Sequence, residues 1–398
     1  VFFISLIFSL MLFFSSEPIA YFLTKNTGYS VFFRFSAILL FAKALVSALS
    51  PIFKIDLDFK SYSISQIINY SLSLLIAIAL LYAGMGLLGV LIAFLAAPII
   101  TLVYILRKKK DNLSLSKFSW DYLKTALAFG APLTFLPILQ WICQVGDQYV
   151  LGYFYGAETV GVYALAYSLA YLLRTFCTPV YAILQPHLTN LWNKSDMKEF
   201  RRFFSFSYKY LFMILIPSSF GIILLAKPIV ILISSSSFGE AHRLLPILCI
   251  SMILFSFVSF SNTLLNLKKR TKTIRNLFLM MAFFNVLLNV IFVPKYGSMA
   301  AAWTTFATFL IAAIFSVYII YKNGLDLMPL FFVKSILASS LMSLVLIAIK
   351  TLDLTLVVKT FMMVFVAVPL YFVIMYFLKA LSKSEIKFIC SLVPNRSF

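Results

Sequence analysis

The sequence predicts an all-α integral membrane protein, a polytopic helical bundle with about 12 transmembrane helices. Hydrophobic residues make up 62% of the 398 positions and charged residues only 12%, whereas soluble domains carry about 25% charged residues. The apolar stretches run for roughly 20 residues, the length that a helix needs to cross about 30 Å of hydrocarbon. A lipid-facing β-barrel would show alternating apolar and polar residues instead, and no such alternation is visible.

Charged residues and turn residues divide the apolar sequence into candidate membrane spans. In chain order the spans are 1–23, 31–52, 63–83, 86–106, 125–146, 157–182, 206–226, 244–265, 274–293, 297–321, 330–349 and 355–378. Between the third and fourth spans, "YAGMGLLG" offers only glycines as turn residues. Pro132 and Pro137 should bend the fifth span, because proline removes a helical hydrogen bond. The glycines before Glu158 predict an outer turn between the fifth and sixth spans.

Lysine and arginine concentrate in every second connection. With residue 1 inside, the connections on the cytoplasmic side hold 23 of the 33 basic residues and those on the opposite side hold 6. Because cytoplasmic loops retain basic residues, we expect a multi-pass protein of the cytoplasmic membrane with both ends of this chain in the cytoplasm. The runs "RKKK" and "LKKRTKTIR" then indicate topology signals and anionic-lipid contacts, so no nucleic-acid partner is expected.

Four basic residues fall inside the spans, where a charge costs at least about 2.5 kcal/mol unless it faces a cavity or a partner. Lys43 lies near the middle of its span, and we expect it to line a water-filled cavity. Arg174 lies about one turn before Pro179, where a cavity and pairing between helices are both compatible with the pattern. Arg34 and Lys334 lie near span ends, from which long side chains can reach the interface.

Polar side chains recur on one face of the fifth span. Gln140, Gln144 and Asp147 share a helical face, with Trp141 beside it. Such a face suits either the lining of an aqueous cavity or a hydrogen-bonded seam between helices. A second pair, at residues 285 and 289 (both Asn), poses the same choice, and its apolar surroundings favour the seam.

No pattern in the sequence indicates catalysis. Neither a Ser/His/Asp arrangement nor paired carboxylates nor a phosphate-binding loop is readable, so we expect a protein that is not an enzyme and holds no cofactor. Coupling to an H⁺ or Na⁺ gradient would require an ionisable group at membrane depth, and Asp147, at the end of the fifth span, is the main carboxylate there. The dispersed cysteines predict small core residues rather than disulfides or a metal site.

Three segments resemble the multidrug/oligosaccharidyl-lipid/polysaccharide (MOP) exporter superfamily, in its polysaccharide-transport branch of O-antigen-type flippases. They are "FGAPLTFLPILQ" at 129–140, "GDQYVLGYFYGAETVGVYALAYSL" at 146–169 and "NVLLNVIFVPKYGSMAAAWTT" at 285–305. The chain departs from the family pattern at Gln148, where Arg is common, and at Ala300, where Gly is usual.

The resemblance implies two lobes of six helices each, sometimes with two added helices. Residues 1–106 would then hold four helices of the N-terminal lobe, 107–124 a cytoplasmic linker, 125–321 the six-helix C-terminal lobe and 330–380 two additional helices. Since only four spans precede the linker, this arrangement places the first two helices of a fourteen-helix member upstream of Val1.

The resemblance also implies a function in the synthesis of surface polysaccharide such as the O-antigen of lipopolysaccharide. A polyprenyl-diphosphate-linked oligosaccharide would cross the bilayer by alternating access of the two lobes, with polysaccharide polymerase machinery as a further partner. Cations in the lumen would lower the cost of moving the diphosphate, a role for Lys43 and Arg174 with Arg34 in reserve. The alternatives are a drug or metabolite cation antiporter of the same superfamily and, less favoured, a membrane polysaccharide polymerase or ligase.

Overall fold

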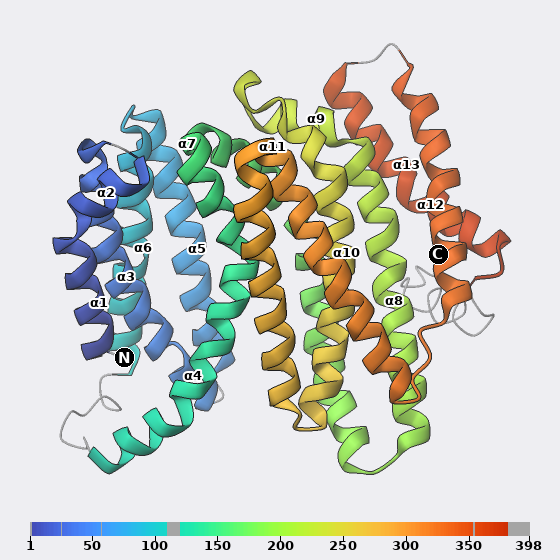
Figure 1. Ribbon diagram of the computed structural model, residues 1–398, viewed down its shortest axis with the longest axis horizontal. Helices are drawn as coiled ribbons and strands as arrows, with labels where there is room; N and C mark the ends of the chain where they lie inside the picture. The colour runs from blue at the N-terminus through green and yellow to red at the C-terminus, as the bar shows by residue number, and fades with distance from the viewer. Residues whose placement is uncertain (1, 25, 57, 110–119, 353–354, 381–398) are drawn as a thin grey trace, which may run out of the picture. The chain divides into compact units, whose positions relative to one another are not determined.

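The computed structural model describes residues 2–24, 26–56, 58–109, 120–352 and 355–380, and within them every regular element is a helix (Figure 1). Among these described residues, nine helices are long and apolar enough to cross a membrane, and a bent helix pair near the N-terminus supplies a tenth candidate span. Two of the nine are broken by glycine into two arms each, so they account for four of the twelve predicted spans. The predicted all-α membrane bundle is therefore confirmed.

The chain divides into two compact units, residues 1–130 and 131–398. Residues 110–119 of the predicted linker lie outside the described part of the chain. The finer division into lobes and added helices stays a prediction.

The first unit contains the helices α1 to α6. Their bounds are α1 Phe2–Phe14, α2 Ser16–Thr24, α3 Ser30–Leu49, α4 Pro51–Ile55, α5 Phe59–Tyr82 and α6 Gly86–Lys108, with a 3₁₀ turn η1 at Thr27–Tyr29. Helix α3 packs against α1 and α6, and α5 packs against α6. Asp58 caps α5 by accepting a hydrogen bond from the backbone N–H of Ser61, and this bond holds the pKa of Asp58 below its usual value.

The first predicted span differs from the structure. Residues 1–23 were expected to form a single helix, but α1 and α2 meet at Ser15 with a bend of 63°. Pro18 explains the break, because it has no N–H with which to continue the hydrogen bonds of α1 and is tolerated only in the first turn of a new helix.

The second unit is built around two helical hairpins. Helix α7 (Trp120–Asn193), which starts in the first unit, breaks at Gly156, and α11 (Thr271–Lys322) breaks at Gly297. Both glycines have positive φ, +80° and +61°, which allows the chain to reverse there without a steric penalty. The predicted turn before Glu158 is confirmed, and its place on the outer side stays a prediction. Figure 1 shows the arms of α11 running side by side.

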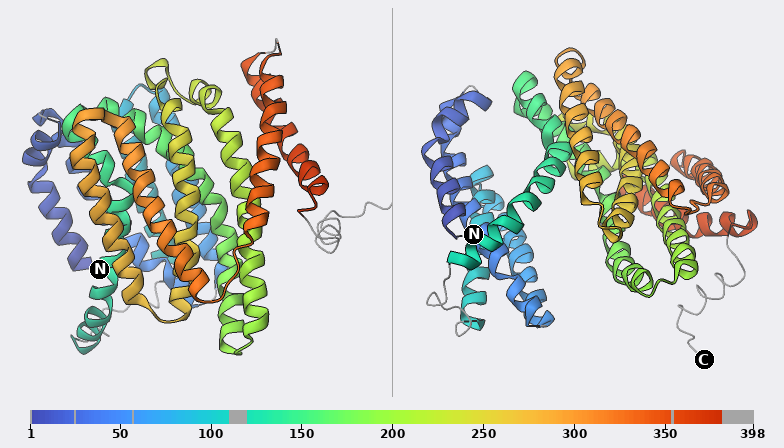
Figure 2. Two further views of the ribbon diagram at one scale, coloured as in Figure 1. Left: turned by 45° about the vertical axis from the view of Figure 1, so that its right-hand side comes forward. Right: turned by 60° about the horizontal axis from the view of Figure 1, so that its bottom comes forward.

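The remaining helices of the second unit pack beside these hairpins. They are α8 Met197–Leu224, α9 Ala226–Ile233, α10 Ala241–Leu267, α12 Pro329–Lys350 and α13 Leu356–Phe377, with a 3₁₀ turn η4 at Ser236–Phe238. Helix α10 packs against α11 and α8, whereas α12 contacts α8 and α13 (Figure 2). One continuous apolar core joins α7, α8, α10 and α11 and fixes the positions of the polar groups described below.

Candidate functional site

Arg174 is held between aromatic rings on the second arm of α7. Its guanidinium carbon lies 4.2 Å from the ring centre of Phe255 on α10 and 5.4 Å from that of Tyr171 one turn earlier. Within the described part of the chain, no ion pair joins Arg174 to a carboxylate. A cation–π contact of this kind is worth about 2 kcal/mol when desolvated. Arg174 thus contacts a second helix through the Phe255 ring, and no carboxylate among the described residues compensates its positive charge.

Lys43 is the corresponding cation of the first unit. It lies on α3 with an exposed side chain, and its Nζ atom is 5.4 Å from the ring centre of Phe94 on α6. Among the residues that the structure describes, no carboxylate pairs with Lys43. Like Arg174, it presents a positive charge supported by an aromatic ring and free to meet an anion.

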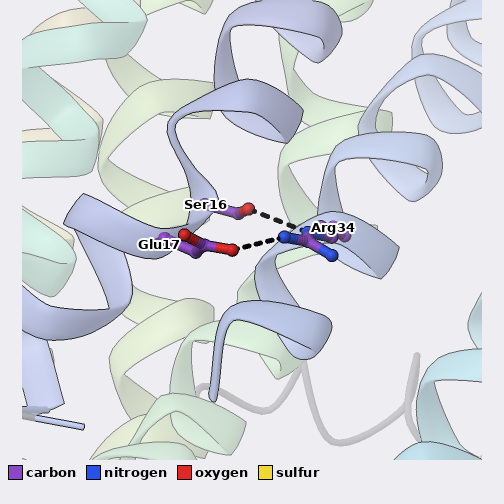
Figure 3. A network of polar contacts seen from close by, with 3 residues as sticks. All are labelled: Ser16, Glu17 and Arg34. Carbon is purple, nitrogen blue, oxygen red and sulfur yellow. Dashed lines mark hydrogen bonds and ion pairs between the residues drawn. The ribbon is translucent and has the colours of Figure 1, made fainter. Parts of the chain in front are cut away.

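Arg34 differs from these two because it is already neutralised. Its Nη2 atom is 2.7 Å from Glu17 Oε1, and its Nε atom donates to Ser16 Oγ at 3.2 Å (Figure 3). The bend between α1 and α2 places Ser16 and Glu17 at the start of α2, facing α3. The pairing makes Arg34 a brace between α2 and α3 and a weaker candidate for substrate contact.

Asp147 lies in the interior of the second unit, with 1% of its surface exposed. Its Oδ2 atom accepts hydrogen bonds from the hydroxyl of Tyr163 on the second arm of α7 and from Thr305 Oγ1 at 3.1 Å on α11. Its Oδ1 atom accepts the N–H of Gln148 at 2.8 Å. The carboxylate therefore joins both arms of α7 to α11 and faces away from any accessible surface.

The residues of the predicted polar face of the fifth span differ in how deeply they are buried. Gln140 and Gln144 are half-buried, and the Trp141 side chain is exposed and packs against Tyr149 with ring centres 5.4 Å apart. Asp147, seven residues after Gln140, turns into the core instead. The two amides and the indole remain candidates for sugar contact, whereas Asp147 belongs to a separate buried cluster.

Two asparagines of α11 complete that cluster. Thr304 donates to Asn289 Oδ1 at 2.9 Å, which links the two arms of α11 as the predicted seam requires. Asn285 is fully buried, yet neither of its side-chain polar atoms has a hydrogen-bond partner in the described structure. A Cβ atom at Gly146, next to Asp147, would lie 3.6 Å from Asn285 Oδ1. An unpaired buried amide costs about 1–3 kcal/mol, so the cluster has unused capacity to bind water or a cation.

Tyr163 and Thr305 were not predicted as partners of Asp147. A signal for Tyr163 is present, since residues 163, 167 and 171 are all tyrosine and the four-residue spacing places them on one helical face. Successive ring centres in this row are 6.2 and 6.3 Å apart. The row runs from the hydroxyl bound to Asp147 to the ring beneath Arg174. Thr305 has no comparable signal.

The prediction that the cysteines are small core residues is confirmed for three of the four. Cys143, Cys177 and Cys249 are buried and free of disulfides, and Cys390 lies outside the described residues. No group of three His, Cys, Asp or Glu side chains that could hold a metal ion occurs in the described part of the chain.

An apolar groove lies between α7, α8 and α9 on one side and the hairpin of α12 and α13 on the other. It encloses about 500 Å³. Its walls include Leu172 and Phe176 of α7, Pro217 of α8, Met342 of α12 and Phe372 of α13. Such a groove suits a hydrocarbon chain and offers little to a polar ligand.

Comparison with known proteins places this architecture in a family. The sequence model of one family, described as polysaccharide biosynthesis protein, matches residues 1–243. The chain belongs to that family. Its fold is that of the MOP exporter superfamily.

Solved structures share the fold at low sequence identity. A lipid II flippase MurJ in an inward closed conformation matches with a TM-score of 0.75 and 17% identity, over 95% of this chain and 81% of that chain. An inward-facing multidrug resistance MATE family transporter of the MOP superfamily matches with a TM-score of 0.65 and 16% identity, over 81% of this chain and 79% of that one.

A curated relative also matches by sequence. It is an uncharacterized membrane protein of Methanocaldococcus jannaschii, 26% identical over 179 residues. The match covers 44% of this chain and 35% of the relative's length.

Proposed function

We propose that this protein is a flippase that moves polyprenyl-diphosphate-linked oligosaccharide across the cytoplasmic membrane by alternating access, for the synthesis of a surface polysaccharide such as O-antigen. The observation that carries the proposal is the state of Lys43 and Arg174, two cations inside membrane helices that rest on aromatic rings and form no ion pair within the described residues. A diphosphate is the ligand that such cations suit, because it supplies the negative charge that each lacks. Both ends of the chain would lie in the cytoplasm.

The apolar groove supports the lipid part of the same substrate. We expect the polyprenyl tail to lie against the groove between α8 and α13 while the head group crosses, because burial of hydrocarbon there costs no hydrogen bonds. The half-buried Gln140 and Gln144, together with the exposed Trp141, offer amide and aromatic groups to the sugars. Polysaccharide polymerase machinery would receive the product.

The experiment replaces the two cations in cells that depend on this protein for their surface glycan. Arg174→Ala and Lys43→Ala should each reduce the amount of surface glycan at least tenfold while the protein remains in the membrane. Without the cation, the negative charge of the diphosphate would cross the hydrocarbon with no compensating positive charge. Lys322→Ala is the matched control, because Lys322 is an exposed cation at the end of α11 and should leave the glycan unchanged. Wild-type glycan levels in both Arg174→Ala and Lys43→Ala would contradict the assignment of these two cations to the diphosphate.

A cation antiporter of the same superfamily is the second candidate, and the buried Asp147 favours it. An antiporter needs an ionisable group that exchanges a coupling ion, and Asp147 with the unpaired Asn285 offers one. The same cluster also serves a flippase driven by an H⁺ or Na⁺ gradient, which we propose as the energy source. Transport of a cationic dye by purified protein in proteoliposomes, with no transport of lipid-linked oligosaccharide, would decide for the antiporter.

A further inference from the structure

A polar pocket opens at one end of the second unit, where α7 and α11 reverse direction. It encloses about 450 Å³ between the tip of α7, the tip of α11 and the first turns of α10. Helix α10 has 27 residues and separates this end from the basic turn at Lys268–Arg270 by roughly 40 Å at 1.5 Å per residue (Figure 1). If the basic turns face the cytoplasm, the pocket opens on the side where a flipped substrate would leave.

The pocket carries an uncompensated positive charge. Its ionisable side chains are Glu240, Arg243 and Lys295. Glu240 pairs with Arg243 at 2.9 Å, which leaves Lys295 exposed and without an ion-pair partner among the described residues. One net positive charge beside a preformed ion pair favours a ligand with a single anionic group.

The remaining walls of the pocket are aromatic and hydroxylic. Tyr155 and Tyr296 contribute rings, the latter 67% exposed, and Thr159 and Ser298 contribute hydroxyls. Flat rings with hydroxyl groups around them suit the mixed apolar and polar faces of a sugar ring. This combination distinguishes the pocket from the apolar groove between α8 and α13.

The pocket is also braced. The Tyr155 hydroxyl donates to the carbonyl of Pro294 at 3.1 Å and so ties the tip of α7 to the tip of α11. A Cβ atom at Gly297 would lie 3.6 Å from the Tyr155 ring, which shows how closely the two turns approach. Walls fixed in this way are preformed, which lowers the entropic cost of binding.

We propose that this pocket binds an anionic saccharide, a sugar bearing one phosphate or carboxylate group, on the face from which the substrate leaves. The inference rests on the proposed function for its biological meaning, since the sugar would be the head of the flipped substrate. Lys295 pairs with the anionic group and Arg243, held by Glu240, donates to the hydroxyls. Tyr296 covers one face of the sugar ring.

Saturation-transfer NMR on the intact protein in phosphatidylcholine nanodiscs tests the pocket, with glucose 1-phosphate as the probe. We expect saturable binding that Lys295→Ala weakens by about fivefold, the effect of losing one exposed ion pair. Lys227→Ala, an exposed lysine on α9 outside the pocket, should bind as the wild type does. Absence of saturable binding to the wild type, or equal binding by Lys295→Ala, would overturn the proposal.

Two further arms separate the sources of the anion. Inorganic phosphate should bind more weakly than glucose 1-phosphate, and equal binding would overturn the saccharide assignment. Binding of glucose 1-phosphate should persist in nanodiscs that contain phosphatidylglycerol, whereas its abolition would make the pocket a phospholipid head-group site. These measurements need no transport, so their failure is distinct from the glycan assay that tests the flippase.

Discussion

At the scale of single residues, the polar groups of the second unit separate into two kinds of site. Arg174 keeps its charge against the Phe255 ring, whereas Asp147 is enclosed by Tyr163 and Thr305. The first arrangement leaves a positive charge that an anion can meet, whereas the second holds a buried carboxylate by hydrogen bonds. In the proposed function, substrate contact therefore falls to Arg174 and ion coupling to Asp147.

Asp147→Asn tests the coupling at this scale. The amide has nearly the same shape and can still accept from Thr305, but it carries no charge and cannot exchange a proton or bind Na⁺ electrostatically. We expect transport of lipid-linked oligosaccharide in proteoliposomes to lose its dependence on an imposed H⁺ or Na⁺ gradient. Asn262→Ala, a change on α10 outside the cluster, serves as control, and a gradient response in Asp147→Asn equal to that of the wild type would contradict the coupling.

The sequence identified these residues as candidates but did not identify their partners. Lys43, Arg174 and Asp147 were recognised because a charge within an apolar span or at its end is costly and therefore informative. Their neighbours were not, since Thr305 is 158 residues from Asp147 and Phe255 lies on another helix. Helical periodicity identifies which residues share a face, but it does not identify which face of a distant helix packs against them.

At the scale of elements, glycines at two turns make the hairpins of the second unit. Gly156 has φ +80° and ψ 179°, a region that only glycine occupies readily. Every predicted span except the first, which is two helices at a bend, corresponds to one membrane-length helical segment or to one arm of a broken helix, because runs of about 20 apolar residues are a strong signal. The bend between α1 and α2 was not predicted, since Pro18 lies inside an otherwise continuous apolar run.

Gly156→Ala and Gly221→Ala form a matched pair that tests the turn. At Gly156 the substitution should destabilise the protein by about 1–3 kcal/mol, because the methyl group disfavours the turn conformation. At Gly221, within α8 and with no atom within 4 Å of an added Cβ, it should stabilise the helix by about 0.5–1 kcal/mol. Apparent melting temperatures of the purified variants in detergent measure both, and a lower melting temperature for Gly221→Ala than for Gly156→Ala would refute the assignment.

At the scale of the whole molecule, membrane orientation connects the fold to the proposed direction of transport. Within the second unit, the turn between α10 and α11 holds three basic residues in a row, Lys268–Arg270, whereas η4 and its flanks form a serine-rich connection at the other end of α10. This asymmetry predicts that the first turn is cytoplasmic and the second is not. The placement of the polar pocket on the exit side and the direction of export both depend on that assignment.

Cysteine labelling measures the orientation of the protein in the membrane directly, and the burial of three native cysteines keeps the background labelling low. Cys143, Cys177 and Cys249 are at most 1% exposed, so they should react slowly with a maleimide that does not cross membranes. In a Cys390→Ser background, Ser237→Cys in η4 should be labelled from outside intact cells, and Lys269→Cys should be labelled only after inverted vesicles are prepared. Both positions are exposed in the structure, so access to each depends on the side of the membrane rather than on burial. Labelling of Lys269→Cys from outside would reverse the topology and with it the assignment of the polar pocket to the exit side.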